Sequence, residues 1–318
     1  MNDHFIKNIE IKNFKCFEEF TAEGFGRVNL IGGKNNVGKT AFMEACYVNV
    51  QAKILNCFIF SLQSIKYMRE NLNILENSAI DNVQTFVEQS NHIFISSNIN
   101  QIHFRIDEND GIKKYHFEFN QQIIDVNAKD FSFALANIYN IQFIDNFGFN
   151  NTQLKNGYLS VQKKDQEQFL NDILNQFDAR IEKFIGGDTP QCRVNGAWLD
   201  LTELGDGARH LVSIVVSLFR CENGTLFIDE LDNGIHYTQL DELWKIILTV
   251  SKEQNVQVFA TTHSKECIES YARVAKKLAD EEVTYSLLTR LKSGKLHHSL
   301  YDYALLENAI IEQAHEVR

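Results

Sequence analysis

Residues 33–40 read Gly-Lys-Asn-Asn-Val-Gly-Lys-Thr and satisfy the pattern G-x-x-x-x-G-K-[ST] in full. An apolar run at 27–31 precedes this stretch, and residues 40–47 place apolar side chains on one side of a helix. A strand, a glycine loop and a helix in this order are typical of a P-loop, whose backbone N–H groups face a phosphate at the positive end of the helix. We therefore expect nucleotide contacts from Gly33, Lys34, Asn35, Asn36, Val37, Gly38, Lys39, Thr40 and Ala41.

Two side chains of this loop have expected chemical roles. Lys39 would neutralise charge on the β- and γ-phosphates, and the Thr40 hydroxyl would bind Mg²⁺. A P-loop also needs a carboxylate on a neighbouring strand, and residues 225–230, T-L-F-I-D-E, are an apolar strand that ends in two acids. We expect Asp229 to hold Mg²⁺ through water and Glu230 to polarise the attacking water. The alternative is a strand that ends in two solvated acids.

A third strand-like run, V-F-A-T-T-H-S at 258–264, carries His263. A lone histidine is more often structural, but ligands bind at the carboxyl ends of strands in a β-α-β sheet. We expect the neutral imidazole of His263 to contact a γ-phosphate and to assist hydrolysis. ATP and Mg²⁺ are thus the predicted cofactors.

The order of elements predicts an α/β fold with a mixed sheet. Strands at 225–228 and 257–260 alternate with helices at 208–219, 237–251 and 265–278, as in a parallel sheet. Residues 93–126 instead alternate apolar and polar around Asp110-Gly111, which predicts a β-hairpin. We therefore expect an ATPase core of residues 1–62 and 190–318, interrupted by an inserted α+β lobe at 63–189.

Composition narrows the classes of function. With 31 Lys and Arg against 42 Asp and Glu, the formal net charge is −11, which argues against indiscriminate binding of nucleic acid or anionic lipid but leaves room for a local basic groove. The six cysteines form no C-x-x-C pair, so reduced thiols are expected rather than disulfides or a zinc site. No signal peptide or bilayer-spanning run is recognisable, which indicates a cytoplasmic protein with no membrane partner.

The motifs together resemble the ABC-type ATPases of the SMC, repair and OLD (overcoming-lysogenization-defect) group, and among them the short stand-alone AAA-type ATP-binding proteins. The resemblance covers nearly the whole chain. It is carried by I-K-N-F-K-C-F at 11–17, the P-loop, L-G-D-G-A-R-H at 204–210, I-D-E-L-D-N-G-I-H-Y at 228–237 and A-T-T-H-S at 260–264. It implies a P-loop NTPase fold of the ABC or SMC-head type.

The resemblance also implies contacts outside the P-loop. In this group the first segment lies by the nucleotide, so Lys15 is a candidate phosphate contact, although an exposed strand lysine is an equally good interpretation. The group's signature loop contacts the γ-phosphate of the opposite subunit, and the residues at its position are Gly205, Asp206, Gly207 and Arg209. Gly205 replaces the usual serine and Asp206 a glycine, so the serine contact is in doubt, while backbone N–H groups and Arg209 could still bind phosphate in trans. Residues 232–236 match the loop that reaches across the dimer, and Gln142 is the candidate lid-loop glutamine.

These features imply a homodimer with ATP at its interface. No heptad run replaces the inserted lobe, so a long coiled-coil arm is not expected, and the residues after Ser264 are too few for a TOPRIM nuclease domain. The family then implies a separately encoded effector, such as a nuclease, and a role in bacterial anti-phage defence.

Two other functions remain open at this point. A DNA repair or recombination ATPase would bind DNA directly through a basic groove formed by Lys163, Lys164, Arg273, Lys276 and Lys277, although solvated helix faces are the better explanation of these residues. The ATP-binding cassette of a membrane pump fits the first and last segments of the chain poorly.

Overall fold

The computed structural model describes residues 4–70, 92–109, 112–127, 136 and 138–307. The chain forms two compact units, which we consider separately. Unit 1 consists of Met1–Phe25, Asn35–Ile141 and Leu288–His298, and unit 2 of Gly26–Lys34, Gln142–Leu287 and Ser299–Arg318.

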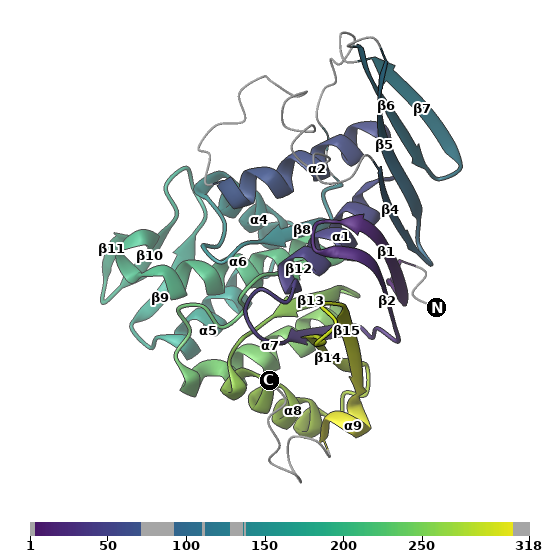
Figure 1. Cartoon of the computed structure of the whole chain (residues 1–318). Coiled ribbons are helices and arrows are strands. Elements are labelled where there is room, and N and C mark those ends of the chain that lie inside the picture. Colours follow the sequence, from purple (N-terminus) through teal and green to yellow (C-terminus); the bar gives the residue numbers. More distant parts are fainter. Residues whose placement is uncertain (1–3, 71–91, 110–111, 128–135, 137, 308–318) are drawn as a thin grey trace. The chain divides into compact units, whose positions relative to one another are not determined.

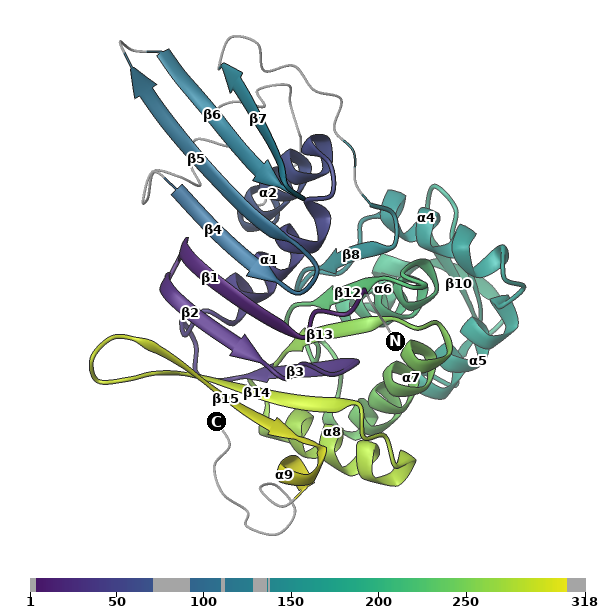
Figure 2. The same ribbon diagram turned by 90° about the vertical axis from the view of Figure 1, so that its right-hand side faces the viewer.

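Unit 1 is built on a six-stranded antiparallel sheet in the order β2-β1-β4-β5-β6-β7. Its strands are β1 (Asn8–Phe14), β2 (Phe17–Glu23), β4 (His92–Ser97), β5 (Gln101–Asn109), β6 (Ile112–Phe119) and β7 (Gln122–Asn127). Figure 2 shows these strands side by side, with α1 (Lys39–Gln51) and α2 (Leu55–Glu70) against one face. The predicted hairpin is confirmed by the pairing of β5 with β6, while its turn at 110–111 lies outside the described residues.

The alternation of apolar and polar residues in these strands explains which face is covered. Ile102 and Phe104 of β5 and Phe117 of β6 are buried, and their neighbours in sequence point to the other face. The Phe58 ring of α2 packs edge-on against this side, with its centroid 6.5 Å from Phe104 and 5.5 Å from Phe117. The aromatic side chains therefore join α2 to the sheet.

Unit 2 contains a six-stranded mixed sheet in the order β15-β14-β3-β13-β12-β8. Its strands are β3 (Val28–Gly32), β8 (Ile141–Ile144), β12 (Thr225–Ile228), β13 (Gln257–Thr261), β14 (Val283–Arg290) and β15 (Leu296–Asp302). The strands β14, β3, β13 and β12 are parallel, which confirms the predicted parallel arrangement. Every residue of β3, β12 and β13 is buried, as expected for parallel strands covered on both faces.

Helices and a smaller sheet complete unit 2 (Figure 1). The helices are α4 (Asn151–Gln162), α5 (Glu167–Phe177), α6 (Asp206–Arg220), α7 (Leu240–Glu253), α8 (Lys265–Leu278) and α9 (Tyr303–Glu307), with short 3₁₀ turns η2 (Leu201–Leu204) and η3 (Tyr237–Gln239). The strands β9 (Ile181–Ile185), β10 (Gln191–Val194) and β11 (Ala197–Asp200) form a three-stranded antiparallel sheet. One hydrophobic core joins α4–α8 to the buried strands.

The two units differ from the predicted division into a core of 1–62 and 190–318 and an inserted lobe of 63–189. The reason is that β1 pairs with β4, from Ile9 opposite Ser97 to Lys12 opposite Phe94. The first strands of the chain thus share a sheet with the inserted strands, whereas residues 142–189 pack within unit 2.

Candidate functional site

The P-loop has the predicted local structure. β3 ends at Gly32 and α1 begins at Lys39, with Gly38 as its N-cap residue at φ +94°. A side chain is strained at this backbone angle, so glycine is the natural residue there. The first turn of α1 carries no side-chain cap and no acidic residue. The positive end of a helix attracts an anion, and no carboxylate of this turn competes for that position. Gly33 and Lys34 belong to unit 2, and the loop from Asn35 onwards belongs to unit 1.

The turn between β1 and β2 packs directly on this loop within unit 1. A Cβ atom at position 38 would lie 2.6 Å from the Sγ of Cys16, so the turn approaches the Gly38 backbone closely. Lys15 occupies the left-handed region at φ +53°, and its Nζ lies 2.5 Å from the Oε2 of Glu44 on α1. Lys15 is thus an ion-paired residue next to the P-loop and not a solvated strand lysine.

In unit 2, the strand order brings the other predicted residues to one edge of the sheet. β13 lies between β3 and β12, and the three strands run parallel. At their carboxyl ends, β3 leads into Gly33, β13 into His263 and β12 into the pair Asp229 and Glu230. Ligands of open α/β sheets bind at this edge.

The hydroxyl of Thr261 links the two acids. Its Oγ1 donates to Asp229 Oδ1 at 2.6 Å and accepts from the backbone N–H of Glu230 at 2.8 Å. Thr261 is fully buried, so this hydroxyl depends on these two partners. Glu230 adopts φ +49°, an uncommon conformation for a residue other than glycine. Thr261 was missed by sequence reasoning, and the only signal for it was its place at the end of β13, two residues before His263.

His263 lies beside Glu230, with its Nε2 3.3 Å from the Glu230 Oε1. The side chain of His263 is 40% exposed and that of Glu230 is 42% exposed, so a water molecule can reach both. Thr262, between Thr261 and His263, donates its hydroxyl to Asp232 Oδ1 at 2.6 Å. A carboxylate next to an imidazole can accept a proton from water and share it.

Asp145 is a further acid at this edge that sequence reasoning did not assign. It follows β8, the neighbour of β12, and the backbone N–H of Asp229 donates to Ile144 O at 2.8 Å. Burial raises the pKa of Asp145, and the charge of Asp229 adds to this, whereas the N–H of Phe147, donated at 2.9 Å, opposes it. Gln142, the predicted lid-loop residue, lies inside β8 and is buried.

The donors of this edge fit a magnesium ion. Mg²⁺ prefers oxygen ligands and keeps several waters, so one or two carboxylates and a hydroxyl suffice for it. Within the described residues, no group of three or more His, Cys, Asp or Glu side chains is arranged to hold a metal ion by itself.

The signature loop begins α6 and touches the loop that follows the acids. A Cβ atom at Gly207 would lie 2.1 Å from the carbonyl oxygen of Gly234, so two backbones meet where no side chain fits. Gly205 adopts φ +88° with no atom within 4 Å of a Cβ built there. The loop backbone is therefore accessible at Gly205 and packed against the Gly234 backbone at Gly207.

Arg209 holds the loop after β8 within the same unit. Its Nη1 donates to Phe149 O at 2.8 Å and its Nη2 to Asn151 Oδ1 at 3.1 Å. Ser213 Oγ accepts from the N–H of Phe149 at 2.9 Å, and Asn233 Nδ2 donates to Asn146 O at 2.6 Å. The loop after β8, the start of α6 and the loop after the acids are therefore tied to one another. The contact of Arg209 with a phosphate in trans stays a prediction.

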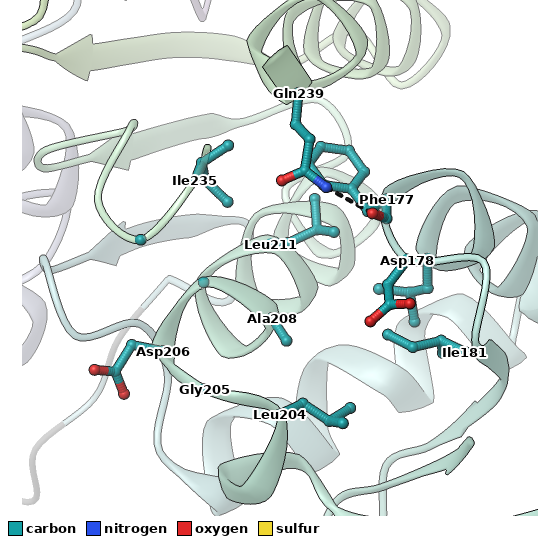
Figure 3. Close-up of a pocket in the computed structure, with 13 residues that line it drawn as sticks. Phe177, Asp178, Ile181, Leu204, Gly205, Asp206, Ala208, Leu211, Ile235 and Gln239 are labelled. Carbon is teal, nitrogen blue, oxygen red and sulfur yellow. Dashed lines mark hydrogen bonds between the residues drawn. The ribbon is translucent and has the colours of Figure 1, made fainter. Parts of the chain in front are cut away.

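A pocket of about 460 Å³ lies behind the signature loop (Figure 3). Its walls combine hydrophobic side chains of α5, β9 and α6 with the backbone of the signature loop and of the loop after the acids. The lining residues are Leu174, Phe177, Asp178, Ile181, Leu204, Gly205, Asp206, Gly207, Ala208, Leu211, Gly234, Ile235 and Gln239. Gln239 Nε2 donates to Phe177 O at 2.6 Å across it, and the ion pair with Arg180 lowers the pKa of Asp178.

Two of the five basic residues considered for DNA binding are paired with acids. Lys164 pairs with Glu222 at 2.9 Å, and Arg273 pairs with Asp241.

None of the six cysteines forms a disulfide. Among the helices described, none has both the length and the apolar character needed to cross a membrane.

Comparisons with known proteins agree with this arrangement. Residues 193–269 match the family described as "AAA domain, putative AbiEii toxin, Type IV TA system". This segment contains the signature loop, Asp229, Glu230 and His263. Over 330 aligned positions the chain is 28% identical to an "ATP/GTP phosphatase" of Helicobacter pylori, with 86% of this chain and 89% of that protein covered.

Two solved SMC head structures share the fold. One is described as the SmcHead bound to the C-winged helix domain of ScpA and aligns with a TM-score of 0.55 and 11% identity, over 94% of this chain and 99% of that chain. The other is an Smc head domain with an extended coiled coil, bound to the C-terminal domain of ScpA derived from Pyrococcus furiosus. It aligns with a TM-score of 0.54 and 8% identity, over 98% of this chain and all of that chain. The predicted fold class is confirmed: the chain has the mixed α/β, ABC-like P-loop NTPase fold of SMC heads.

Proposed function

We propose that this protein binds ATP with Mg²⁺ and hydrolyses it to ADP and phosphate. The observation that carries the proposal is the order β3-β13-β12, which places the start of the P-loop, His263 and the pair Asp229 and Glu230 at one edge of a parallel sheet. The similarity to the Helicobacter pylori protein supports hydrolysis of a nucleoside triphosphate.

Each residue has a defined part in this proposal. Lys39 would neutralise charge on the β- and γ-phosphates, and Thr40 and Asp229 are the residues that would hold Mg²⁺. When bound, Mg²⁺ supplies charge stabilisation to the phosphate oxygens. Glu230 orients a water molecule and accepts its proton, and His263, whose Nε2 lies 3.3 Å from the Glu230 Oε1, contacts the γ-phosphate.

We further propose that two copies close around two ATP molecules and that closure regulates a separately encoded partner. The accessible backbone at Gly205 and its direct link through Gly207 to Gly234 support a phosphate contact that senses the opposite subunit. The family that matches residues 193–269 is described in terms of a toxin and a toxin–antitoxin system, which supports a defence role with an effector such as a nuclease. Six cysteines without a disulfide fit a cytoplasmic location.

Direct DNA binding is the weaker alternative, because two of the five basic residues that suggested it are already paired with acids. The two functions differ in an ATP-dependent and salt-sensitive DNA affinity, which only the DNA-binding ATPase would show.

The substitution Glu230→Gln tests the assignment. It removes the proton acceptor and keeps the size of the side chain, so ATP turnover should fall about 100-fold or more while Mg·ATP remains bound. Native mass measurement should then show a trapped dimer. Glu242→Gln is the matched control, because Glu242 is a half-buried acid on α7 that pairs with Lys245. Unchanged phosphate release by Glu230→Gln would refute the assigned site.

A further inference from the structure

We propose that Glu44 is a positioning residue, which holds the ammonium of Lys15 beside the P-loop so that Lys15 binds the phosphates of the nucleotide. The inference rests on the proposed ATPase function and adds a residue that no motif contains. It concerns unit 1 alone, to which Lys15, Glu44 and the P-loop from Asn35 onwards belong.

The first step is the position of the turn that carries Lys15. Phe14 pairs with Phe17 across the β1–β2 hairpin, which leaves Lys15 and Cys16 as a two-residue turn. Both phenylalanines are 1% exposed, so the base of the turn is anchored in the core. The close approach of Cys16 Sγ to Gly38 then seats the turn at the N-terminal end of α1.

The second step is the position of Glu44 on α1. Glu44 follows Thr40 by four residues, and residues at this spacing lie on the same face of a helix. The ion pair with Glu44, at 2.5 Å, therefore draws the Lys15 ammonium to the face of α1 that also carries the Thr40 hydroxyl. Thr40 is the P-loop residue with a proposed role at the metal and phosphate.

The third step is the burial of the pair. The Glu44 side chain is 1% exposed and that of Lys15 is 16% exposed. A buried carboxylate that lost this counter-charge would be strongly destabilising, so Lys15 is expected to stay with Glu44 when a nucleotide binds. An ammonium carries three N–H donors, and a bond to Glu44 is compatible with a further bond to a phosphate oxygen.

These steps explain what Glu44 contributes. A free lysine side chain samples many rotamers, and ordering it on a ligand costs conformational entropy. Glu44 orders Lys15 before the nucleotide arrives, so this cost falls on folding and not on binding. Two other roles for Glu44 give different results: a purely structural ion pair would change stability alone, and a restraint on Lys15 would weaken nucleotide binding in the wild type.

The test compares Glu44→Gln, Lys15→Met and the double variant in the full-length protein. The affinity for Mg·ATP is measured by calorimetry, KM and kcat by phosphate release, and stability by thermal unfolding. Each single variant should weaken Mg·ATP binding about tenfold, and KM should rise more than kcat falls, because a charged hydrogen bond to the ligand is lost or misplaced. The double variant should bind no more weakly than Lys15→Met, since Glu44 acts through Lys15.

Lys12→Met is the matched control, because it removes an exposed ammonium of β1 that pairs with Glu10 at 2.8 Å. It should bind Mg·ATP as the wild type does. Glu44→Asp keeps the buried charge but shortens the side chain, and it replaces Glu44→Gln if that variant does not fold.

Wild-type or tighter affinity in the Glu44 variants would overturn the inference, as would independent effects that add in the double variant. Failure of the proposed function is distinguishable from this result. In that case the wild-type protein would bind no Mg·ATP, or Glu230→Gln would hydrolyse it normally, whatever residue stood at position 44.

Discussion

Replacing Thr261 by valine would remove the hydroxyl that joins the two acids and keep the shape of the side chain. The lost interactions are the hydrogen bond to the Asp229 carboxylate and the bond from the backbone N–H of Glu230. A hydrogen bond to a charged group contributes about 1.5–3 kcal/mol and a neutral one about 0.5–1.5 kcal/mol. We therefore expect the free energy of unfolding to fall by about 2–4.5 kcal/mol.

The kcat of Thr261→Val should fall further than its lower free energy of unfolding alone would explain. In the wild type the backbone N–H of Glu230, a residue with φ +49°, donates to the Thr261 hydroxyl. In Thr261→Val the Glu230 backbone loses this partner, which fixes its uncommon conformation. A displacement of about 1 Å in a catalytic group can slow a reaction about 100-fold, and we expect kcat to fall by that order. The assay is phosphate release at saturating Mg·ATP, well below the unfolding temperature.

Thr284→Val is the matched control for this experiment. Thr284 is a buried threonine of β14 in the same sheet, and its hydroxyl donates to Asn29 Oδ1 at 2.8 Å, away from the two acids in the strand order. Its loss should lower stability and leave kcat unchanged. If Thr261→Val is destabilised but turns over ATP as fast as Thr284→Val, the hydroxyl does not position the acids and the reasoning fails.

Two further predictions concern the start of α6. Gly207→Ala should slow ATP turnover and lower the unfolding temperature, because its Cβ would lie 2.1 Å from the Gly234 carbonyl oxygen. Gly187→Ala is the control, because its new methyl group makes ordinary contacts and should change neither quantity. Equal behaviour of the two variants would contradict the importance of the Gly207–Gly234 contact. Burial lowers the pKa of His210 to about 4, so its neutral form stabilises the fold above the ordinary value of 6.5, and this stability is lost as the pH falls through 4. In His210→Leu the free energy of unfolding should lose about 3 kcal/mol of its dependence on pH between these two values. Urea unfolding at pH 4 and 7 measures this change. The same pH dependence in the variant and the wild type would rule out this histidine as its source.

Much of the site could be predicted from the sequence because its motifs are local. The glycine loop at 33–40 and the acids after an apolar strand need only neighbouring residues to be recognised. His263 could be predicted as well, since parallel strands expose their carboxyl ends at one edge of the sheet. The structure adds that His263 lies beside Glu230, at 3.3 Å.

The remaining contacts depend on pairings that no local pattern contains. Asp145 became part of the site because β8 lies next to β12, although the two strands are far apart in sequence. Thr261 joins the acids for the same reason, through the register of β13 with β12. The two compact units differ from the predicted division because β1 pairs with β4, and an alternating strand does not reveal its partner.

The position of β3 has a consequence for biosynthesis. Val28 of this strand lies opposite Val258 on one side and Val283 on the other, so the two neighbours of the P-loop strand are synthesised roughly 230 and 255 residues after it. At about 5–20 residues per second, the strand waits on the order of 10–50 s for them. The P-loop strand therefore has no partner strand on either side until β13 and β14 have been synthesised.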